Sequence, residues 1–480
     1  MSVRVRIAPS PTGMLHVGNA RSAVFNWLFA RHHGGTFIVR VDDTDVARSE
    51  ERYVTQMIKA MRWLGLDWDE GVGVGGPHGS YRQSDRFDRY REVAEQLITD
   101  GAAYRCFCTS EELDVRRQVA QAAGRPPGYD GACRTLSSEQ VQTRMAAADA
   151  FSVRLAVPRP GVTEFFDLVR DDMRFDHDVI DDFVILRSDG TPTYHLASTV
   201  DDVDYEITHV ARGEDLLSST PRHILLTRAM GAEPVIYAHL PLLFGPDGKK
   251  LSKRHGDTSM DSYMKAGYLS EAMFNYMSLL GWSYDPEITI YSREQAIEKF
   301  DLADVSKNPA VFDTKKLEWM SGEYMRELAP DDFVVRSLPF IEAKRKLSDD
   351  ERRRFEVMAP LIQERVKVLP EVVEMSEWIF VDEVSFDEAS WDKVMKPEAV
   401  SVLDDAISRL EGLTEWSTEA IEHVMRQMLE DLELNPRKGF QPLRVAVTGS
   451  MISPPLFESM EVLGQLATVA RLRRALARFV

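Results

Sequence analysis

The first ninety residues alternate between strand and helix patterns, and this alternation constrains the fold more than any other feature. Apolar residues alternate with arginines over 3–7, which predicts a strand ended by a proline-rich turn. A helix is expected over 19–31, a second strand over 37–41 and a second helix over 49–64. Strands and helices joined by short connections predict a parallel sheet with right-handed crossovers. Ligands of such sheets bind at the carboxyl ends of the strands.

The remainder of the 480-residue chain is expected to add further domains. From about residue 90 the pattern changes, and parallel-sheet character returns near 204–210 and 235–240. Beyond residue 250 the chain becomes helical. One helical stripe consists of Ile421, Val424, Met425, Met428 and Leu429. The predicted fold class is α/β, with an α+β insertion between the halves of the sheet and an all-α C-terminal half.

Composition limits the classes of partner. The net charge of −19 disfavours nonspecific binding of nucleic acid, although basic residues are locally clustered. No uncharged apolar run reaches 18 residues, so no membrane span is expected. The N-terminus lacks the apolar region of a signal peptide, and a cytoplasmic location is therefore expected.

Two short stretches carry the chemistry. Ser10-Pro11-Thr12-Gly13 runs on to His16-Val17-Gly18-Asn19, and Lys250-Leu251-Ser252-Lys253-Arg254 follows two glycines. The first places a histidine donor and a small residue where a strand meets a helix, and the second supplies lysines for charge developing at a phosphate. Either stretch alone is equally compatible with a surface histidine or a solvated loop. Together they predict a site for ATP.

These motifs are similar to those of class I aminoacyl-tRNA synthetases, and within that class the chain resembles the bacterial glutamyl-tRNA synthetases. The stretch 16–19 matches the His-x-Gly-x motif, and 250–254 matches the Lys-x-Ser-Lys-Arg loop. Further matches lie at 6–13, 194–197 and 212–215, and the resemblance weakens beyond about residue 328. It implies an ATP site that consists of His16, Gly18, Asn19, Lys250, Ser252 and Lys253. Among these, His16, Lys250 and Lys253 are implied to be catalytic.

The resemblance also implies a division into regions. A Rossmann-type catalytic domain is expected over 1–89 and 195–247, interrupted by an acceptor-binding subdomain over 90–194. A stem-contact region with the lysine loop is expected over 248–328, and a helical anticodon-binding region over 329–480.

Glutamate has two carboxylates and one ammonium, so a selective pocket needs cations and an anion. A guanidinium can bind a carboxylate with two hydrogen bonds. By the resemblance, Arg212 contacts the side-chain carboxylate and Asp42 lies near the α-amino group. Ser198 stands where the family often has asparagine, and a water is expected to bridge the difference in length. The full implied set is Arg6, Ser10, Asp42, Tyr194, Ser198 and Arg212.

Three cysteines, Cys106, Cys108 and Cys133, lie within 28 residues. An odd number in a cytosolic chain disfavours disulfides. They resemble the zinc site of some glutamyl enzymes, and structural zinc takes four ligands. Thr135 occupies the position at which some relatives have histidine, so the resemblance implies Tyr129 as the fourth ligand. The alternative is a metal-free cluster of buried thiols.

The implied reaction forms glutamyl-adenylate from L-glutamate and ATP with Mg²⁺, and then transfers glutamate to tRNA(Glu). Whether tRNA(Gln) is also charged stays open, and a monomer is expected. Three alternatives remain. The first is a glutaminyl-tRNA synthetase, whose C-terminal half is expected to form β-barrels. The others are a tRNA-modifying paralogue, which lacks an anticodon-binding region, and a non-catalytic RNA-binding relative.

Overall fold

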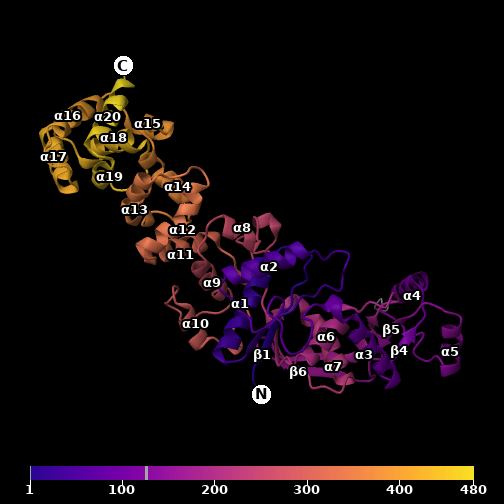
Figure 1. Cartoon of the computed structure of the whole chain (residues 1–480). Helices are drawn as coiled ribbons and strands as arrows, with labels where there is room; N and C mark the ends of the chain where they lie inside the picture. Colours follow the sequence, from indigo (N-terminus) through magenta and orange to yellow (C-terminus); the bar gives the residue numbers. More distant parts are fainter. Residues whose placement is uncertain (1, 125–127, 480) are drawn as a thin grey trace. The chain divides into compact units, whose positions relative to one another are not determined.

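The computed structural model of the chain describes residues 2–124 and 128–479, without the side chain of Lys253, and it divides into two compact units. Unit 1 comprises Met1–Tyr263 and Met273–Asp313, and unit 2 comprises Met264–Ala272 and Thr314–Val480. Figure 1 labels the elements along the chain. Within the described ranges, no helix combines the length and apolar composition needed to cross a bilayer.

The predicted parallel sheet is present in unit 1. Its first part has the order β1-β2-β3 and its second part the order β7-β6-β10-β9. Every pair is parallel except the hairpin of β6 and β7. The two parts meet where the Thr208 amide donates to the Arg4 carbonyl at 2.9 Å. The strands are β1 (Arg4–Ile7), β2 (Thr36–Val39), β3 (Glu70–Gly71), β6 (Val162–Asp167), β7 (Asp171–Asp176), β9 (His209–Gly213) and β10 (Ile236–Leu240).

Both faces of β1 are covered, as parallel sheets require. Val5 and Ile7 are buried, as their alternation predicts. Arg6, on the other face, is also buried, with 4% of its surface exposed. A buried guanidinium needs a partner, and Arg6 has one in Asp202 (Nε to Oδ1, 3.0 Å).

Helices cover this sheet. α1 was expected to bury one face, but it is buried around nearly its whole circumference. The helices of unit 1 are α1 (Val17–His32), α2 (Glu51–Trp63), α3 (Phe87–Thr99), α4 (Ser110–Ala122), α5 (Ser138–Ala146), α6 (Tyr194–Asp204), α7 (Thr220–Ala229) and α10 (Arg293–Lys299). Along the chain, α8 (Met260–Lys265) and α9 (Ser270–Ser278) each span a boundary between the two units.

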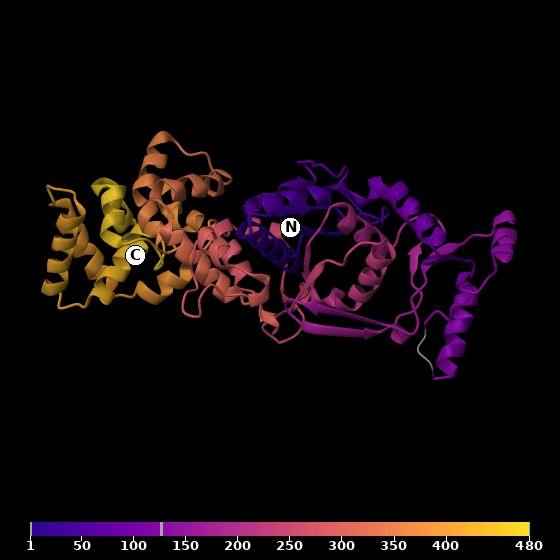
Figure 2. The ribbon, with the colours of Figure 1, turned by 90° about the horizontal axis from the view of Figure 1, so that it is seen from below.

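The stretch 90–194 contributes to two sheets. β4 (Ala103–Cys106), β5 (Ser152–Leu155) and β8 (Val184–Leu186) form an antiparallel sheet of their own, whereas β6 and β7 join the parallel sheet. Neither α4 nor α5 has a buried residue. Both helices lie at the end of unit 1 remote from α1 in both views (Figures 1 and 2). A short parallel pair, β11 (Leu243–Phe244) and β12 (Ala310–Val311), completes the described strands.

Unit 2 is helical, as predicted, and no strand occurs in the described residues from 314 to 479. The stripe on α17 is confirmed, because Ile421, Met425, Met428 and Leu429 are buried in one large core. The remaining helices are α11 (Thr314–Glu327), α12 (Pro330–Glu342), α13 (Asp349–Gln363), α14 (Glu371–Ser376), α15 (Glu388–Val394), α16 (Ala399–Glu411), α17 (Thr418–Asp431), α18 (Pro436–Thr448), α19 (Leu456–Leu463) and α20 (Gln465–Ala477).

Candidate active site

A large cleft opens at the carboxyl ends of β1, β9 and β10, where ligands of parallel sheets bind. Its volume of about 1380 Å³ exceeds the roughly 300–1,000 Å³ of ordinary small-molecule sites, so it has room for two ligands. Apart from Lys253, every residue predicted for ATP or glutamate lines it. These residues are Arg6, Ser10, His16, Gly18, Asn19, Asp42, Tyr194, Ser198, Arg212, Lys250 and Ser252.

His16 is the N-cap of α1. Its Nδ1 accepts the backbone N–H of Gly18 at 3.1 Å. In the neutral ring the proton therefore resides on Nε2, which is left as a donor. Desolvation lowers the pKa of His16, and the cation of Lys250 lowers it further, against the opposing effect of Asp215. The ring is thus a neutral donor beside a helix N-terminus, which suits a phosphate oxygen.

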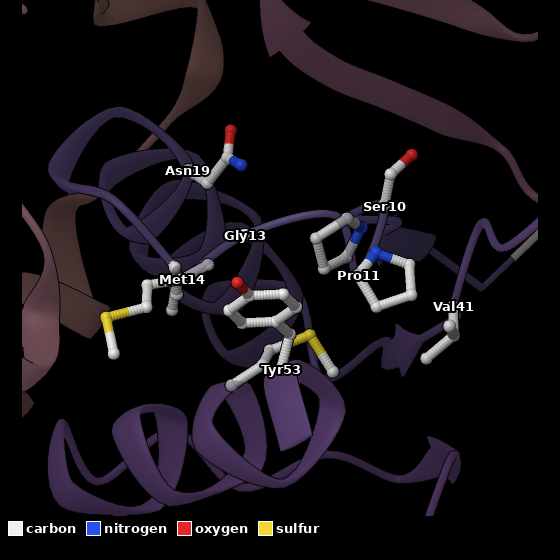
Figure 3. A pocket seen from close by; sticks show the side chains of 10 residues that line it. Ser10, Pro11, Gly13, Met14, Asn19, Val41 and Tyr53 are labelled. Carbon is white, nitrogen blue, oxygen red and sulfur yellow. The ribbon is translucent and has the colours of Figure 1, made fainter. Parts of the chain in front are cut away.

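Gly18 leaves space for the side chain of His16. A Cβ at this position would lie 3.0 Å from Cε1 and 3.2 Å from Nδ1 of the His16 ring. The missing side chain therefore makes room for the His16 ring, in addition to leaving the backbone open to close approach by a ligand. Beside it, a recess of about 20 Å³ separates the Ser10 hydroxyl and the Asn19 amide from the Tyr53 ring (Figure 3).

The lysine loop is tied to the first motif by backbone hydrogen bonds. Val17 N donates to Thr258 O, and Met260 N donates to Leu15 O, each at 2.9 Å. At the other end of the loop, Leu251 N donates to Leu243 O at 2.8 Å. Two signature stretches that lie more than two hundred residues apart are therefore neighbours in the fold.

Within this loop, the Lys250 ammonium lies 3.8 Å from the Asp215 carboxylate, and both side chains are more than half exposed. A contact of this kind is weak and easily exchanged for a phosphate. Ser252 is exposed, and its backbone N–H donates to His255 Nδ1 at 3.1 Å. Lys253 begins the short helix η4 (Lys253–His255), and its side chain falls outside the described part of the structure.

Arg212 lies on β9. Its Nη1 donates to the Tyr194 hydroxyl at 3.0 Å, and its Nη2 donates to Thr220 Oγ1 at 2.8 Å and to the Leu216 carbonyl at 3.3 Å. Each of these partners is neutral. Within the described residues Arg212 has no carboxylate partner, so its charge is available to a ligand in the cleft.

Arg6 and Asp42 belong to a buried ionic network that sequence reasoning did not foresee. Its centre is Arg40, whose side chain is fully buried and chelates Asp42 at 2.6 and 3.1 Å. Arg40 also donates to Asp202 at 2.9 Å and to the Ser198 hydroxyl at 3.2 Å. Burial raises the pKa of Asp42 even though the Arg40 guanidinium opposes the rise. An ammonium bound at Asp42 would share this carboxylate with Arg40.

α6 explains why these side chains converge. Tyr194, Ser198 and Asp202 recur every four residues and therefore lie on one face of the helix. Arg21 is a further residue that the sequence did not single out. It lines the cleft from α1 and donates to the carbonyls of Pro241 and Leu280, and burial lowers its pKa to about 10. No sequence signal set it apart, because the same helix also contains Asn19, Ser22, Asn26 and Arg31.

Residues 2–319 match the family described as tRNA synthetases class I (E and Q), catalytic domain. The chain belongs to this class I tRNA synthetase family. Residues 332–476 match an anticodon binding domain.

Relatives of this synthetase family align over nearly the whole chain. A protein of Dehalococcoides mccartyi named glutamate--tRNA ligase is 48% identical, with 99% of this chain and 98% of the relative covered. One of the same name from Moorella thermoacetica is 46% identical, over 100% and 98%. The crystal structure of a glutamate tRNA ligase from Elizabethkingia meningosepticum, solved with its amino acid, superposes with a TM-score of 0.90 at 32% identity and covers 99% of each chain.

In this family member the three cysteines form a cluster apart from the cleft. Their sulfur atoms lie within 4.8 Å of one another, with Cys108 and Cys133 at 3.6 Å. The Tyr129 hydroxyl lies 3.3 Å from Cys106 Sγ and 3.9 Å from Cys108 Sγ. Zinc–sulfur bonds of about 2.3 Å in a tetrahedron place the sulfurs roughly 3.8 Å apart. The donor set therefore fits a four-coordinate zinc ion.

Proposed function

We propose that the chain attaches L-glutamate to tRNA(Glu) at the expense of ATP. In the first step an α-carboxylate oxygen of glutamate bonds to the α-phosphorus of ATP, and pyrophosphate leaves. In the second step the terminal ribose hydroxyl of the tRNA bonds to the acyl carbon, its proton is lost, and AMP leaves. The observation that carries this proposal is the Arg212 guanidinium, which has only neutral partners and lines the same cleft as His16 and Lys250.

We assign phosphate binding to His16 and to the lysine loop. The Nε2–H of neutral His16 donates to a phosphate oxygen, and the lysines stabilise negative charge as pyrophosphate departs. Gly18, Asn19 and Ser252 also line the cleft and complete the set proposed for ATP. Mg²⁺ enters with ATP and is held largely by phosphates and water. No covalent nucleophile of the protein is needed, so the contribution of the chain is positioning and charge stabilisation.

We assign the side-chain carboxylate of glutamate to Arg212 and Tyr194. A glutamine side chain is neutral and would leave the Arg212 charge without an anionic partner, which is the proposed basis of discrimination. The Nη1 of Arg6 is its one nitrogen not used by Asp202, so it is free to meet the α-carboxylate beside Ser10. Asp42 accepts the ammonium, and Ser198 acts through a bridging water.

The test is the charging of purified tRNA(Glu) by wild-type protein and by Arg212→Ala. The KM for glutamate should rise at least a hundredfold, because a charge-assisted pair inside a cleft is lost, while the KM for ATP stays within about threefold. Equal increases for both substrates would contradict the assignment of Arg212. Failure of the wild type to charge glutamate would overturn the proposed function itself.

A parallel assay with tRNA(Gln) decides whether the second tRNA is also accepted. We propose the glutamate tRNA as the substrate and a monomer as the active form, which light scattering of the active fraction checks. The glutaminyl alternative called for β-barrels in the C-terminal half, whereas the described residues from 314 to 479 are helical.

We further propose that residues 90–194 face the acceptor end of the tRNA, 248–328 the stem, and 329–480 the anticodon. The match of 332–476 to an anticodon binding domain supports the last assignment. A photo-crosslinker at Val115, which is 59% exposed on α4, should then react with nucleotides of the acceptor end. Reaction with the anticodon loop would contradict this assignment.

We propose that Cys106, Cys108, Cys133 and Tyr129 hold a structural zinc ion. The ion would supply no chemistry to the reaction and would fasten Tyr129 and Cys133 to Cys106 at the end of β4. Protein purified without chelators should contain close to one equivalent of zinc. A content far below one equivalent favours the metal-free alternative.

A further inference from the structure

Arg212 has one more partner, on the neighbouring strand. His239 of β10 is the parallel-sheet partner of Arg212 on β9, so the two side chains lie next to each other. Arg212 Nε donates to His239 Nε2 at 3.2 Å. Thr220 Oγ1 lies 2.9 Å from the same nitrogen and can donate to it while accepting from Arg212. His239 is fully buried and therefore does not touch the substrates proposed above.

The opposite side of the imidazole determines its tautomer. Asp167, also fully buried, places Oδ2 2.6 Å from His239 Nδ1. Its Oδ1 accepts three backbone N–H groups, from Val169, Arg170 and His239, at 2.9–3.1 Å. A carboxylate can only accept here, so Nδ1 carries the proton and Nε2 of the neutral ring is an acceptor. Burial lowers the pKa of His239, which keeps the ring neutral.

A neutral acceptor differs from the partners of the other arginines. Arg6 and Arg40 are held by carboxylates that cancel their charge. His239 fixes the orientation of the Arg212 guanidinium and does not neutralise its positive charge. A carboxylate in this place would neutralise the guanidinium and remove the reason to prefer an anionic side chain.

We propose that His239, with its tautomer set by Asp167, is the positioning residue that aims Arg212 and thereby sets the preference for glutamate over glutamine. This inference rests on the proposed function, in which Arg212 meets the side-chain carboxylate.

The first test uses two amides of similar size and polarity. In His239→Gln the amide oxygen can occupy the Nε2 position and still accept from Arg212. In His239→Asn the amide can still donate to Asp167 but does not reach Arg212. We expect the KM for glutamate to rise about 10- to 100-fold in the asparagine variant, as for loss of a hydrogen bond to a charged group, and to stay within about threefold in the glutamine variant. The KM for ATP should be nearly unchanged in both.

The second test leaves His239 in place. In Asp167→Asn the amide oxygen is needed by the three backbone N–H groups, so the NH₂ group faces Nδ1. The ring must then accept at Nδ1 and carry its proton on Nε2, directed at the Arg212 donor. The KM for glutamate should rise, and the ratio of kcat/KM for glutamate to that for glutamine should fall at least tenfold.

Three outcomes would overturn the inference while wild-type charging of glutamate upholds the proposed function. One is an unchanged KM for glutamate in both His239→Asn and Asp167→Asn. Another is an equal loss in His239→Asn and His239→Gln. The third is a parallel rise in the KM for ATP, because a merely structural role would not separate the two substrates. If the wild type does not charge glutamate, the proposed function fails, and this inference fails with it.

Discussion

Replacing Gly18 by alanine is expected to slow catalysis without weakening the fold. The added methyl would lie 3.0 Å from Cε1 of His16, about 0.5 Å inside the roughly 3.5–4.0 Å optimum for carbon atoms. The ring must therefore move, and its hydrogen bond from Gly18 N–H, 3.1 Å long, must stretch. Since Gly18 lies in the first turn of α1, alanine should raise helix stability by up to about 1 kcal/mol.

The expected loss follows from the displacement. A misplacement of about 1 Å costs roughly 10²-fold in rate, so half that distance corresponds to about tenfold. The weakened hydrogen bond adds about 0.5–1.5 kcal/mol, or a further two- to tenfold. We therefore expect kcat of adenylate formation to fall about 20- to 100-fold, with the KM for ATP changed less than about threefold.

The assay is ATP–pyrophosphate exchange with tRNA and glutamate saturating, accompanied by a thermal melt. Gly412→Ala is the control, because a Cβ there would meet its nearest neighbour, the Arg409 carbonyl oxygen, at an ordinary 3.6 Å and the residue does not line the cleft. It should leave kcat near that of the wild type. If Gly18→Ala instead raises the KM for ATP and leaves kcat unchanged, then the glycine only makes room for the nucleotide. That result would refute the argument that Gly18 is needed to position His16.

Two further predictions concern other parts of unit 1. Tyr129→Phe removes the phenolic oxygen from the cysteine cluster and leaves the three cysteines in place. The variant should lose zinc to a chelator faster than the wild type does. Loss of zinc at the wild-type rate would exclude Tyr129 as a ligand. Burial and the Arg222 and Arg212 cations lower the pKa of His195 to about 4, so between pH 6.5 and 4 the unfolded chain binds a proton that the folded chain does not. Stability should therefore fall as the pH falls, by about 1.6 kcal/mol from pH 6.5 to pH 5. Urea titrations of the wild type and His195→Gln at both pH values measure this contribution, and the fall in stability should be smaller in the variant by this amount, because other buried histidines such as His239 still contribute.

The sequence predicted the parts of the site that short motifs encode. His16 and Lys250 stand in stretches whose spacing has a chemical meaning by itself, and the cleft contains both. The partners of these side chains were not predictable, because they lie far away in the chain. Asp202 is 196 residues from Arg6, and Arg40 is 158 residues from Ser198. A buried arginine at the end of an apolar run looks the same in sequence as an exposed one.

Sheet membership was limited in the same way. A local sequence pattern can predict that β6 and β7 are strands, but it does not predict which sheet they join. The structure pairs β6 with β10 and so brings Asp167 beside His239. The positions of the side chains around Arg212 therefore depend on a pairing between strands far apart in the sequence, which hydrophobic periodicity alone cannot predict.

The hydrogen bonds between Leu15–Val17 and Thr258–Met260 limit how far the lysine loop can travel. Leu251 is held on Leu243, and Thr258 is held on the backbone next to His16. The six residues between these anchors make seven Cα–Cα steps, which span at most about 25 Å when extended, so the loop is a short tether held at both ends. Movement of the loop is therefore short-range, and Lys250, next to the Leu251 anchor, stays close to His16 and to the phosphate site proposed there. An insertion between 252 and 257 would lengthen this tether and lower the local concentration of Lys253 and Arg254 in the cleft, without replacing any residue of the loop.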